Sequence, residues 1–274
     1  MILSPTRELA NRTVEEFNKL ALNTGLKCVV GMGGDGYRSQ IRLIKEGRTF
    51  VIATPGRLID LEKKRFINLQ GFKTVVLDEV DQMLDMGFID DIKYVVSKLG
   101  TSRQSLFFSA TMSPKEETLA NSLLQSPIKI ELEAQSPLKT ISQDIVKVTS
   151  RNQKMPILHG LLEKEEFSKV LIFSSTKIGA DKISDELRQK GMKVDSLHGN
   201  KSQSKRSQIL AKFKHNEIDI LVATDVAARG IDVPNITHVI NYDEPATYND
   251  YIHRIGRTGR IGKKGVDLTF VVGF

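Results

Sequence analysis

The sequence of 274 residues has no tryptophan, a single cysteine and no long apolar run. Cys28 alone excludes an internal disulfide and offers no metal-binding cluster. No apolar stretch approaches the ~20 residues that a membrane-spanning helix needs. The first ten residues lack the basic start and apolar core of a secretory signal. We therefore expect no membrane contact and a cytoplasmic location, with the nucleus or a reducing organelle as alternatives.

Aromatic residues make up only 6% of the chain, which argues against base stacking as the main mode of nucleic-acid binding. The net charge of +7 is a mild bias toward polyanions. Residues 1–140 carry 19 basic and 17 acidic residues, and residues 141–274 carry 21 and 16. The excess is therefore spread along the chain, as in many enzymes, and favours contacts with a nucleic-acid backbone over a basic tail.

Short apolar runs alternate with amphipathic segments along the whole chain. The runs that we predict to be buried strands are Lys27–Gly31, Thr49–Ala53, Thr74–Asp78, Ser105–Ser109, Val170–Ser174, Ile220–Thr224 and Thr237–Tyr242. Strands that are apolar throughout and alternate with helices predict an α/β fold, in which helices cover both faces of parallel sheets. Ligands of such sheets bind outside the carboxyl ends of the strands.

Two segments between these runs have the apolar spacing of helices. They are Glu8–Asn23, with Leu9, Val14, Phe17, Leu20 and Ala21 on its apolar face, and Gly179–Lys190, with Ile183 and Leu187 inward. The alternation breaks where Pro127, Pro137 and the polar stretch 133–136 occur. We therefore predict a first domain over residues 1–132, a linker over 133–140 and a second domain over 141–274.

Three arginines recur at every third position near the C-terminus: Arg254, Arg257 and Arg260, with one glycine between each pair of neighbours. A guanidinium group suits bidentate contact with phosphate oxygens and neutralises charge on a γ-phosphate. Glycine lets the backbone approach a ligand closely. The pattern therefore favours a phosphate site over a solvated basic turn.

Two other polar segments follow predicted strands. Asp78-Glu79-Val80-Asp81 comes after an apolar run, an arrangement that delivers carboxylates to a metal–phosphate site, although acidic residues are also common in turns. Thr224 and Gly230 follow the strand at 220–222 and are small enough to admit a phosphate backbone. Asp232 is suited to accept a ribose hydroxyl.

Together these segments resemble, in order, the motif series of the DEAD-box RNA helicases of superfamily 2. The matching segments are Pro5–Ala10, Gly33-Gly34, Thr54–Arg57, Asp78–Asp81, Ser109–Thr111, Leu171–Thr176, Leu197–Gly199 with Gln203 and Arg206, Ala223–Asp232 and His253–Arg260. The resemblance covers almost the whole chain. It implies two tandem RecA-like domains and an ATP-dependent RNA helicase that remodels or unwinds RNA duplexes.

The resemblance also implies roles for single residues in ATP and Mg²⁺ chemistry. Asp78 holds Mg²⁺ through water with Glu79 beside it, and Glu79 orients and deprotonates the attacking water. Arg257 and Arg260 are arginine fingers from the second domain, and Asp232 contacts the ribose of ATP. The residues implied to couple nucleotide state to domain closure are Asp81, Ser109, Thr111 and His253.

An RNA path is implied in both domains. Its residues are Thr6, Arg7, Gly34, Thr54 and Arg57 in the first domain and Thr176, Arg206, Thr224 and Gly230 in the second. Contacts of this kind reach phosphate and sugar, so we expect a monomer that binds RNA without sequence preference. Taken singly, each residue also suits a helix cap or turn, as Thr54-Pro55-Gly56 does.

The sequence departs from the family pattern in two ways. Val80 stands where the family's name implies alanine, but the three carboxylates remain, so we expect little chemical effect. The family places a P-loop, Gly-x-x-x-x-Gly-Lys-Ser/Thr, and an adenine-reading glutamine motif upstream of Pro5, and neither is in the sequence. Gly262-Lys263 is followed by Lys264 and is no substitute. The family's last helix, after 265–272, is also missing.

We therefore expect a first domain truncated at its N-terminus and a chain that is inactive alone. In its sheet, we expect Leu106–Ser109 or a neighbour to lack a pairing partner. Two alternatives stay open from the sequence. One is an ATP-independent clamp for RNA or a protein partner, derived from the helicase fold. The other is a truncated product without activity.

We predict that this chain binds ATP weakly and hydrolyses it negligibly, because no phosphate-binding loop and lysine are present in the sequence. Nucleotide titration and phosphate release, each measured with and without RNA, check this expectation. Robust RNA-stimulated turnover that Glu79→Gln abolishes would contradict it.

Overall fold

The computed structural model describes residues 1–34, 36–131, 140–228, 230–231, 233–259 and 263–273. The chain divides into two compact units, Met1–Glu131 and Leu132–Phe274. Apart from Thr140, the predicted linker lies outside the described residues and stays a prediction. Among the residues described, no helix has the length and apolar character needed to cross a bilayer.

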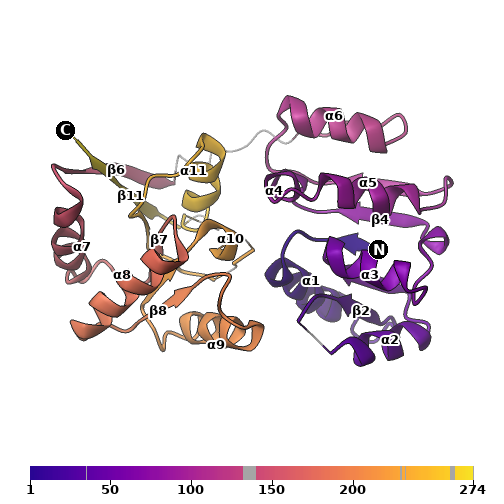
Figure 1. The fold of residues 1–274 in the computed structure, drawn as a ribbon, viewed down its shortest axis with the longest axis horizontal. Helices are drawn as coiled ribbons and strands as arrows, with labels where there is room; N and C mark the ends of the chain where they lie inside the picture. Colours follow the sequence, from indigo (N-terminus) through magenta and orange to yellow (C-terminus); the bar gives the residue numbers. More distant parts are fainter. Residues whose placement is uncertain (35, 132–139, 229, 232, 260–262, 274) are drawn as a thin grey trace. The chain divides into compact units, whose positions relative to one another are not determined.

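The first unit is built on a five-stranded sheet in the order β2-β3-β1-β4-β5, in which every pairing is parallel (Figure 1). Its strands are β1 Ile2–Leu3, β2 Cys28–Gly31, β3 Phe50–Ala53, β4 Thr74–Leu77 and β5 Gln104–Phe107. Its helices are α1 Arg7–Leu20, α2 Tyr37–Lys45, α3 Pro55–Lys63, α4 Val80–Asp85, α5 Ile89–Ser97 and α6 Pro114–Leu123, with a 3-10 turn at Leu69–Gly71.

Alternate strand residues of this sheet point into two different cores. In β3, Val51 packs with the helices α3, α4 and α5, whereas Ile52 packs with Ala10 of α1. Both residues are at most 3% exposed. Because side chains of a strand alternate between the two faces of its sheet, this strand must be apolar throughout.

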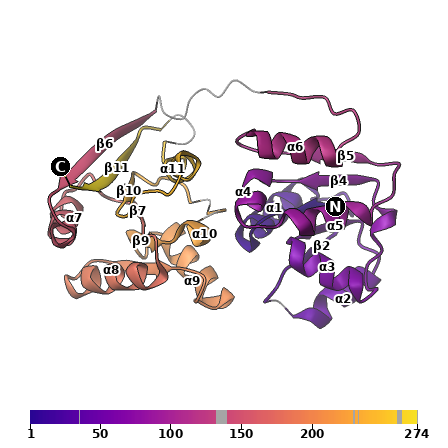
Figure 2. The ribbon, with the colours of Figure 1, turned by 45° about the horizontal axis from the view of Figure 1, so that its top comes forward.

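The second unit has a six-stranded parallel sheet in the order β6-β11-β10-β7-β9-β8 (Figure 2). Its strands are β6 Ile141–Val148, β7 Val170–Phe173, β8 Val194–Leu197, β9 Ile220–Ala223, β10 His238–Asn241 and β11 Gly265–Val272. Its helices are α7 Lys154–Leu162, α8 Lys177–Gln189, α9 Gln203–Lys214, α10 Asp225–Ala228 and α11 Tyr248–Ile255, with a 3-10 turn at Arg151–Gln153. In β7, Val170 and Ile172 pack in the core that contains α7 and α8, and Leu171 and Phe173 pack in the core that contains α9.

The seven predicted strands are confirmed to within two residues at each end, and so are the parallel sheets. β1, β6, β8 and β11 were not predicted. β1 has only two residues, β6 is mostly exposed, and polar Asp195 and Ser196 interrupt the apolar pattern of β8. The prediction for Leu20 is wrong: α1 ends there and its side chain is 82% exposed.

β5 lies at an edge of the first sheet and pairs with β4 alone among the described strands. This position agrees with the expectation of an unpaired strand around Leu106–Ser109. Phe108, just after β5, is 53% exposed. An edge strand with exposed apolar neighbours is prone to pair with other chains.

A carboxylate is buried in the second sheet. Asp267 of β11 is 1% exposed and accepts hydrogen bonds from Asn241 (2.9 Å) and from the Tyr251 hydroxyl (3.1 Å). Burial raises the pKa of Asp267 to about 6, although the hydrogen bonds oppose this shift. The folded protein therefore holds a proton on Asp267 between about pH 4 and pH 6 that the unfolded chain releases.

We predict that the second unit becomes less stable as the pH rises through this window, because its folded state binds this proton more tightly than the unfolded chain does. Asp267→Asn stays neutral, so its free energy of unfolding relative to the parent chain should rise by roughly 2–3 kcal/mol from pH 4 to pH 7. Denaturant unfolding at several pH values measures this difference, with Asp144→Asn as an exposed control. A difference that is flat with pH would show that Asp267 is ionised in the fold.

Candidate functional site

The polar residues singled out in the sequence lie at the carboxyl ends of the two parallel sheets. Thr6, Gly34, Thr54 and Asp78 follow β1, β2, β3 and β4, and Ser109 follows β5. In the second unit Thr176 follows β7 and Thr224 follows β9. Parallel pairing gathers each group at one edge of its own sheet, the edge at which ligands of such sheets bind.

Asp78 and Glu79 form the turn between β4 and α4. Glu79 has a φ of 51°, a left-handed conformation that is uncommon for a residue with a side chain. The amide of Val80 donates to the Phe108 carbonyl (3.0 Å), which ties this turn to the end of β5. Burial raises the pKa of Asp78 above its usual range. The turn therefore holds two neighbouring carboxylates at the sheet edge, one of them partly desolvated.

The side chain of Asp81 bonds the segment that follows β5. It is 2% exposed, and its Oδ2 accepts from the amides of Ala110 and Thr111 (both 3.1 Å) and from the Thr111 hydroxyl (3.3 Å). The Ser109 hydroxyl in turn donates to the Thr111 carbonyl (2.6 Å). The segments Asp78–Asp81 and Ser109–Thr111 are thus joined directly, through the buried and fully hydrogen-bonded carboxylate of Asp81.

Arg7 lies in space that the two glycines leave open. A methyl group built on Gly34 would lie 2.6 Å from Nη1 of Arg7, and one on Gly33 would lie 3.1 Å from Nη2. Gly34 also has a φ of 88°, which other residues rarely adopt. Thr6 caps α1, with its hydroxyl accepting from the Leu9 amide (3.2 Å). The accepting hydroxyl keeps its own proton to donate to a ligand.

Arg57 is held by two residues that the sequence analysis did not name. Its Nη1 donates to Oε1 of Gln40 (2.7 Å), and its guanidinium lies 5.0 Å from the centre of the Tyr37 ring. Gln40 is 3% exposed and donates from its Nε2 to the Met32 carbonyl (2.9 Å). Thr54 begins α3 without a side-chain capping bond, so its hydroxyl is not used as a cap.

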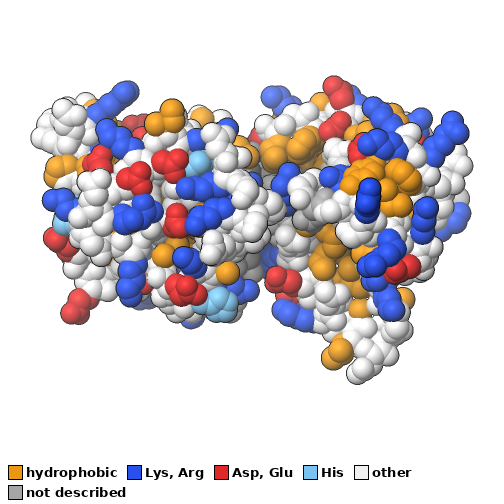
Figure 3. Space-filling model, turned by 60° about the horizontal axis from the view of Figure 1, so that its bottom comes forward, with side chains coloured by type: hydrophobic (Ala, Val, Ile, Leu, Met, Phe, Trp, Pro, Cys, Tyr) orange, Lys and Arg blue, Asp and Glu red, His pale blue; other side chains and the backbone are white. Residues whose placement is uncertain are grey.

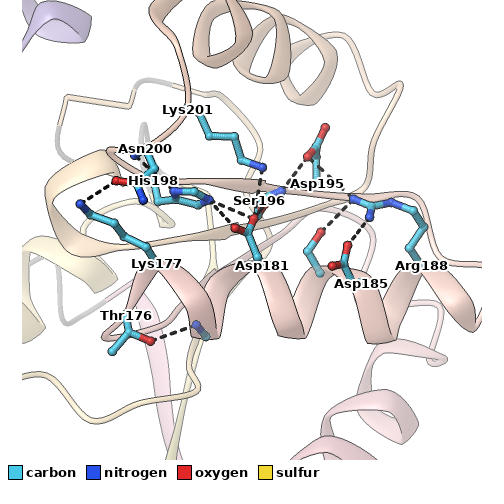
Figure 4. Close-up of polar contacts among 12 residues, drawn as sticks. Thr176, Lys177, Asp181, Asp185, Arg188, Asp195, Ser196, His198, Asn200 and Lys201 are labelled. Atoms are coloured by element: carbon cyan, nitrogen blue, oxygen red, sulfur yellow. Dashed lines mark hydrogen bonds and ion pairs between the residues drawn. The ribbon is translucent and has the colours of Figure 1, made fainter.

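In the second unit, α8 begins with a threonine cap. The Thr176 hydroxyl accepts from the Gly179 amide (2.9 Å), as Figure 4 shows. A side chain at Gly179 would collide with the hydroxyls of Ser174 and Thr176. Arg206 lies in the first turn of α9, which Ser202 caps. Thr224 is 8% exposed and Gly230 has a φ of 74°, so both are small residues in tight backbone.

The three arginines near the C-terminus are not equivalent. Arg254 is 2% exposed and forms a bidentate ion pair with Asp225 (2.6 and 2.8 Å). Its Nη1 also donates to Asn241 (3.0 Å) and to the Asp243 carbonyl (2.7 Å). The regular spacing suggested three phosphate ligands, but Arg254 is committed to holding α11 against β10 and α10.

Arg257 is partly exposed at the end of α11. Its Nε donates to the His253 carbonyl (3.2 Å) and its Nη1 to the Ile231 carbonyl (2.9 Å). A small hollow adjoins it, lined by Phe173, Asp225, Ala228, Asp250, His253, Arg254 and Arg257. The hydrogen bonds to two carbonyls orient the guanidinium before any ligand binds. Arg260 and Asp232 lie outside the described residues, so their implied roles stay predictions.

The described part of both units holds no ready-made metal site and no single basic patch on the face shown in Figure 3. No group of three or more histidine, cysteine or acidic side chains lies close enough together to hold a metal by itself. Lysine and arginine side chains are spread over the face shown in Figure 3 and are interspersed with acidic ones. A metal ion at Asp78 and Glu79 would therefore need ligands from a nucleotide and water, as Mg²⁺ at phosphate sites usually has.

Two family models match the chain. The model for DEAD/DEAH box helicases matches residues 1–119, and the model for the helicase conserved C-terminal domain matches residues 153–262. Baker's yeast Dbp5, solved with RNA and ADP BeF3, is 31% identical with a TM-score of 0.86, over 98% of this chain and 70% of that chain. The chain belongs to the DEAD-box helicase family.

Curated DEAD-box relatives support the same assignment. The chain is 41% identical to the ATP-dependent RNA helicase RhlB of Shewanella piezotolerans and 42% identical to the ATP-dependent RNA helicase CshA of Limosilactobacillus reuteri. These matches cover 98% and 99% of this chain but only 62% and 54% of the relatives. The structure of Mss116p bound to ssRNA and AMP-PNP is 32% identical with a TM-score of 0.83, over 99% of this chain and 58% of that one.

Sequence reasoning did not single out Gln40 or Asp225, and it expected Arg254 to bind phosphate, although all three hold motif segments in place. Gln40, Asp225 and Arg254 each make buried or bidentate hydrogen bonds to a motif segment. A usable signal existed for Asp225, which follows an apolar strand as Asp78 does. Gln40 offered no such signal, because a lone glutamine in an amphipathic helix is expected to lie on the surface.

We predict that Gly34→Ala destabilises the first unit more than Gly47→Ala. Both glycines have a positive φ, but only Gly34 faces a side chain, since nothing lies within 4 Å of a methyl group on Gly47. The difference should be at least ~1 kcal/mol in denaturant unfolding, the usual cost of overpacking. Adding Arg7→Ala to Gly34→Ala should remove the difference, and equal losses at the two glycines would contradict this geometry.

Proposed function

We propose that this chain is the part of an ATP-dependent RNA helicase that grips the RNA backbone and carries acidic and arginine groups for ATP hydrolysis. The observation that carries the proposal is the collection of hydroxyls, arginines and carboxylates at the carboxyl ends of both parallel sheets. The relatives RhlB and CshA are named ATP-dependent RNA helicases, and Dbp5 was solved with RNA and a nucleotide.

The RNA-binding groups suit phosphate and sugar rather than bases. The hydroxyls of Thr6 and Thr176 each accept a hydrogen bond from a backbone amide, and each can donate its own hydrogen bond to a phosphate oxygen. Arg57 is held by Gln40 before RNA binds, which lowers the entropic cost of binding, and Arg7 lies in the space that Gly33 and Gly34 leave open. Arg206, Thr224 and Gly230 continue this set in the second unit. Contacts to phosphate and sugar carry no sequence information, so we propose binding without sequence preference.

The nucleotide chemistry would use Asp78 and Glu79 of the first unit and Arg257 and Arg260 of the second. Two adjacent carboxylates after a parallel strand fit an Mg²⁺ ion that also binds nucleotide phosphates. When bound, Mg²⁺ neutralises charge on the phosphates. Glu79 would orient the attacking water, the arginines would stabilise negative charge, and Asp232 would bind the ribose.

The coupling role rests on Asp81. Because its carboxylate bonds the backbone of Ala110 and Thr111, a shift at Asp78–Glu79 moves the segment after β5 with it. We propose that Ser109 and Thr111 transmit nucleotide state in this way, and that His253 does so beside Arg257. The expectations of a monomer and of a cytoplasmic location rest on the sequence alone.

We predict weak, salt-dependent and sequence-indifferent binding of single-stranded RNA by this chain. Three arginines on phosphates give a slope of log K against log salt of about −2. Arg206→Ala should weaken binding more than Arg57→Ala, because residues 141–274 carry +5 of the +7 net charge. Fluorescence anisotropy with several unrelated RNAs of equal length measures these values.

Arg42→Ala is the matched control, since this arginine of α2 is 75% exposed and pairs only weakly with Glu46 (3.7 Å). It should leave affinity and slope unchanged, whereas each RNA-binding arginine removed should lower the slope by about 0.7. Strong preference for one RNA sequence, or tight binding at physiological salt, would contradict the proposal. Tight binding would favour the ATP-independent clamp instead.

A further inference from the structure

One carboxylate outside the motif series connects several elements of the second unit. Asp181 lies on α8, one turn beyond the Thr176 cap, and its side chain points to the carboxyl end of β8 (Figure 4). Its Oδ1 accepts from the Ser196 hydroxyl (2.5 Å) and from Nζ of Lys201 (3.2 Å), and Nε2 of His198 lies 2.9 Å from the carboxylate. Three donors from one strand and its following turn thus converge on one side chain.

The proton on His198 can be assigned from its neighbours. Nδ1 of His198 faces the Asn200 amide (3.4 Å), which is a donor, so Nδ1 accepts. Nε2 therefore carries the proton and donates it to Asp181. His198 is 4% exposed, so this hydrogen bond is shielded from water although Asp181 itself is half-exposed. A shielded, charge-assisted hydrogen bond is stronger than a surface ion pair.

Asp181 keeps its negative charge over the whole physiological range. Burial raises the pKa of Asp181, but the hydrogen bonds from Ser196, His198 and Lys201 outweigh it and lower the pKa to about 2. The carboxylate therefore stays available as a hydrogen-bond acceptor near neutral pH. Its role is to hold structure and not to transfer a proton.

The turn that Asp181 holds leads directly into α9. Residues 198–202 join β8 to this helix, Ser202 caps it, and Arg206 lies in its first turn. A second bond holds the same turn: Nζ of Lys177 in the first turn of α8 donates to Oδ1 of Asn200 (2.9 Å). Two residues of the helix that Thr176 caps, Lys177 and Asp181, thus bond the turn before Arg206.

An ordinary ion pair on the same helix offers a comparison. Asp185, one turn further along α8, pairs with Arg188 (2.6 Å), and both side chains are at least half-exposed. Exposed pairs of this kind contribute little to stability. Asp185 bonds no residue of the 198–202 turn among the contacts described, so it shares the helix and the charge of Asp181 but not its position.

We propose that Asp181 is a positioning residue for RNA binding, which fixes the 198–202 turn and thereby sets Arg206 at a constant place relative to Thr176. This inference rests on the proposed function, because it assigns the phosphate contact to Arg206. Asp181 itself is negatively charged and does not touch RNA. By fixing the turn, Asp181 keeps the Arg206 guanidinium and the Thr176 hydroxyl at a constant spacing. Neither group then has to be ordered when it binds a phosphate.

A double-mutant cycle on the chain tests this role, with RNA affinity measured by anisotropy at low salt. Asp181→Asn should weaken binding about fivefold, although it removes a negative charge and would strengthen binding if charge alone mattered. Asp185→Asn removes the same charge and should leave binding unchanged or slightly tighter. In the Arg206→Ala background, Asp181→Asn should cost almost nothing more, because its effect passes through Arg206.

Hydrogen exchange provides a readout that does not depend on RNA. Asp181→Asn should speed the exchange of amides over 199–206 while those of β7 and β9 stay protected, and Asp185→Asn should not. Ser196→Ala, which removes one of the three donors, gives a milder form of the same effect if Asp181→Asn does not fold. Failure of the parent chain to bind RNA would overturn the proposed function. Binding by the parent with no loss in Asp181→Asn, or with losses that add to that of Arg206→Ala, would overturn the inference alone.

Discussion

The parallel pairing of β1 with both β3 and β4 is the constraint on which the first unit depends. Only Ile2 and Leu3 form this strand, yet they pair with Ile52 and Ala53 on one side and with Val76 and Leu77 on the other. This register places the residues that follow the three strands, Thr6, Thr54 and Asp78, at one edge of the sheet. Parallel pairing does the same in the second unit, so many of the groups proposed to bind RNA and nucleotide lie where a strand ends and a helix begins.

Several groups proposed to bind ligands are already held in place by the fold. Thr6 and Thr176 cap helices and keep a hydroxyl proton, Arg57 lies between Gln40 and Tyr37, and Arg257 donates to two carbonyls. Preorganised groups lose little entropy on binding, which suits contacts that must form on any RNA sequence. The fold and the binding surface therefore share the same hydrogen bonds.

The sequence predicted much of the fold, because fully apolar strands between amphipathic helices allow few other architectures. It did not predict β8, since Asp195 and Ser196 break the apolar pattern, and no pattern shows that the buried Ser196 hydroxyl donates to Asp181. Leu20 was predicted inward because periodicity does not show where a helix ends. Arg254 looked like its neighbour Arg257, because regular spacing cannot separate an arginine that binds a ligand from one that pairs with Asp225.

Hydrogen exchange with and without single-stranded RNA tests the central claim, that RNA lies at the carboxyl ends of both sheets. RNA-dependent protection is expected over 54–58, 176–180 and 199–206, all of which follow strands. Segments that precede strands, such as 47–49, 71–73 and 217–219, should exchange equally fast in both conditions. Protection concentrated in those preceding segments, with none at the strand ends, would contradict the account.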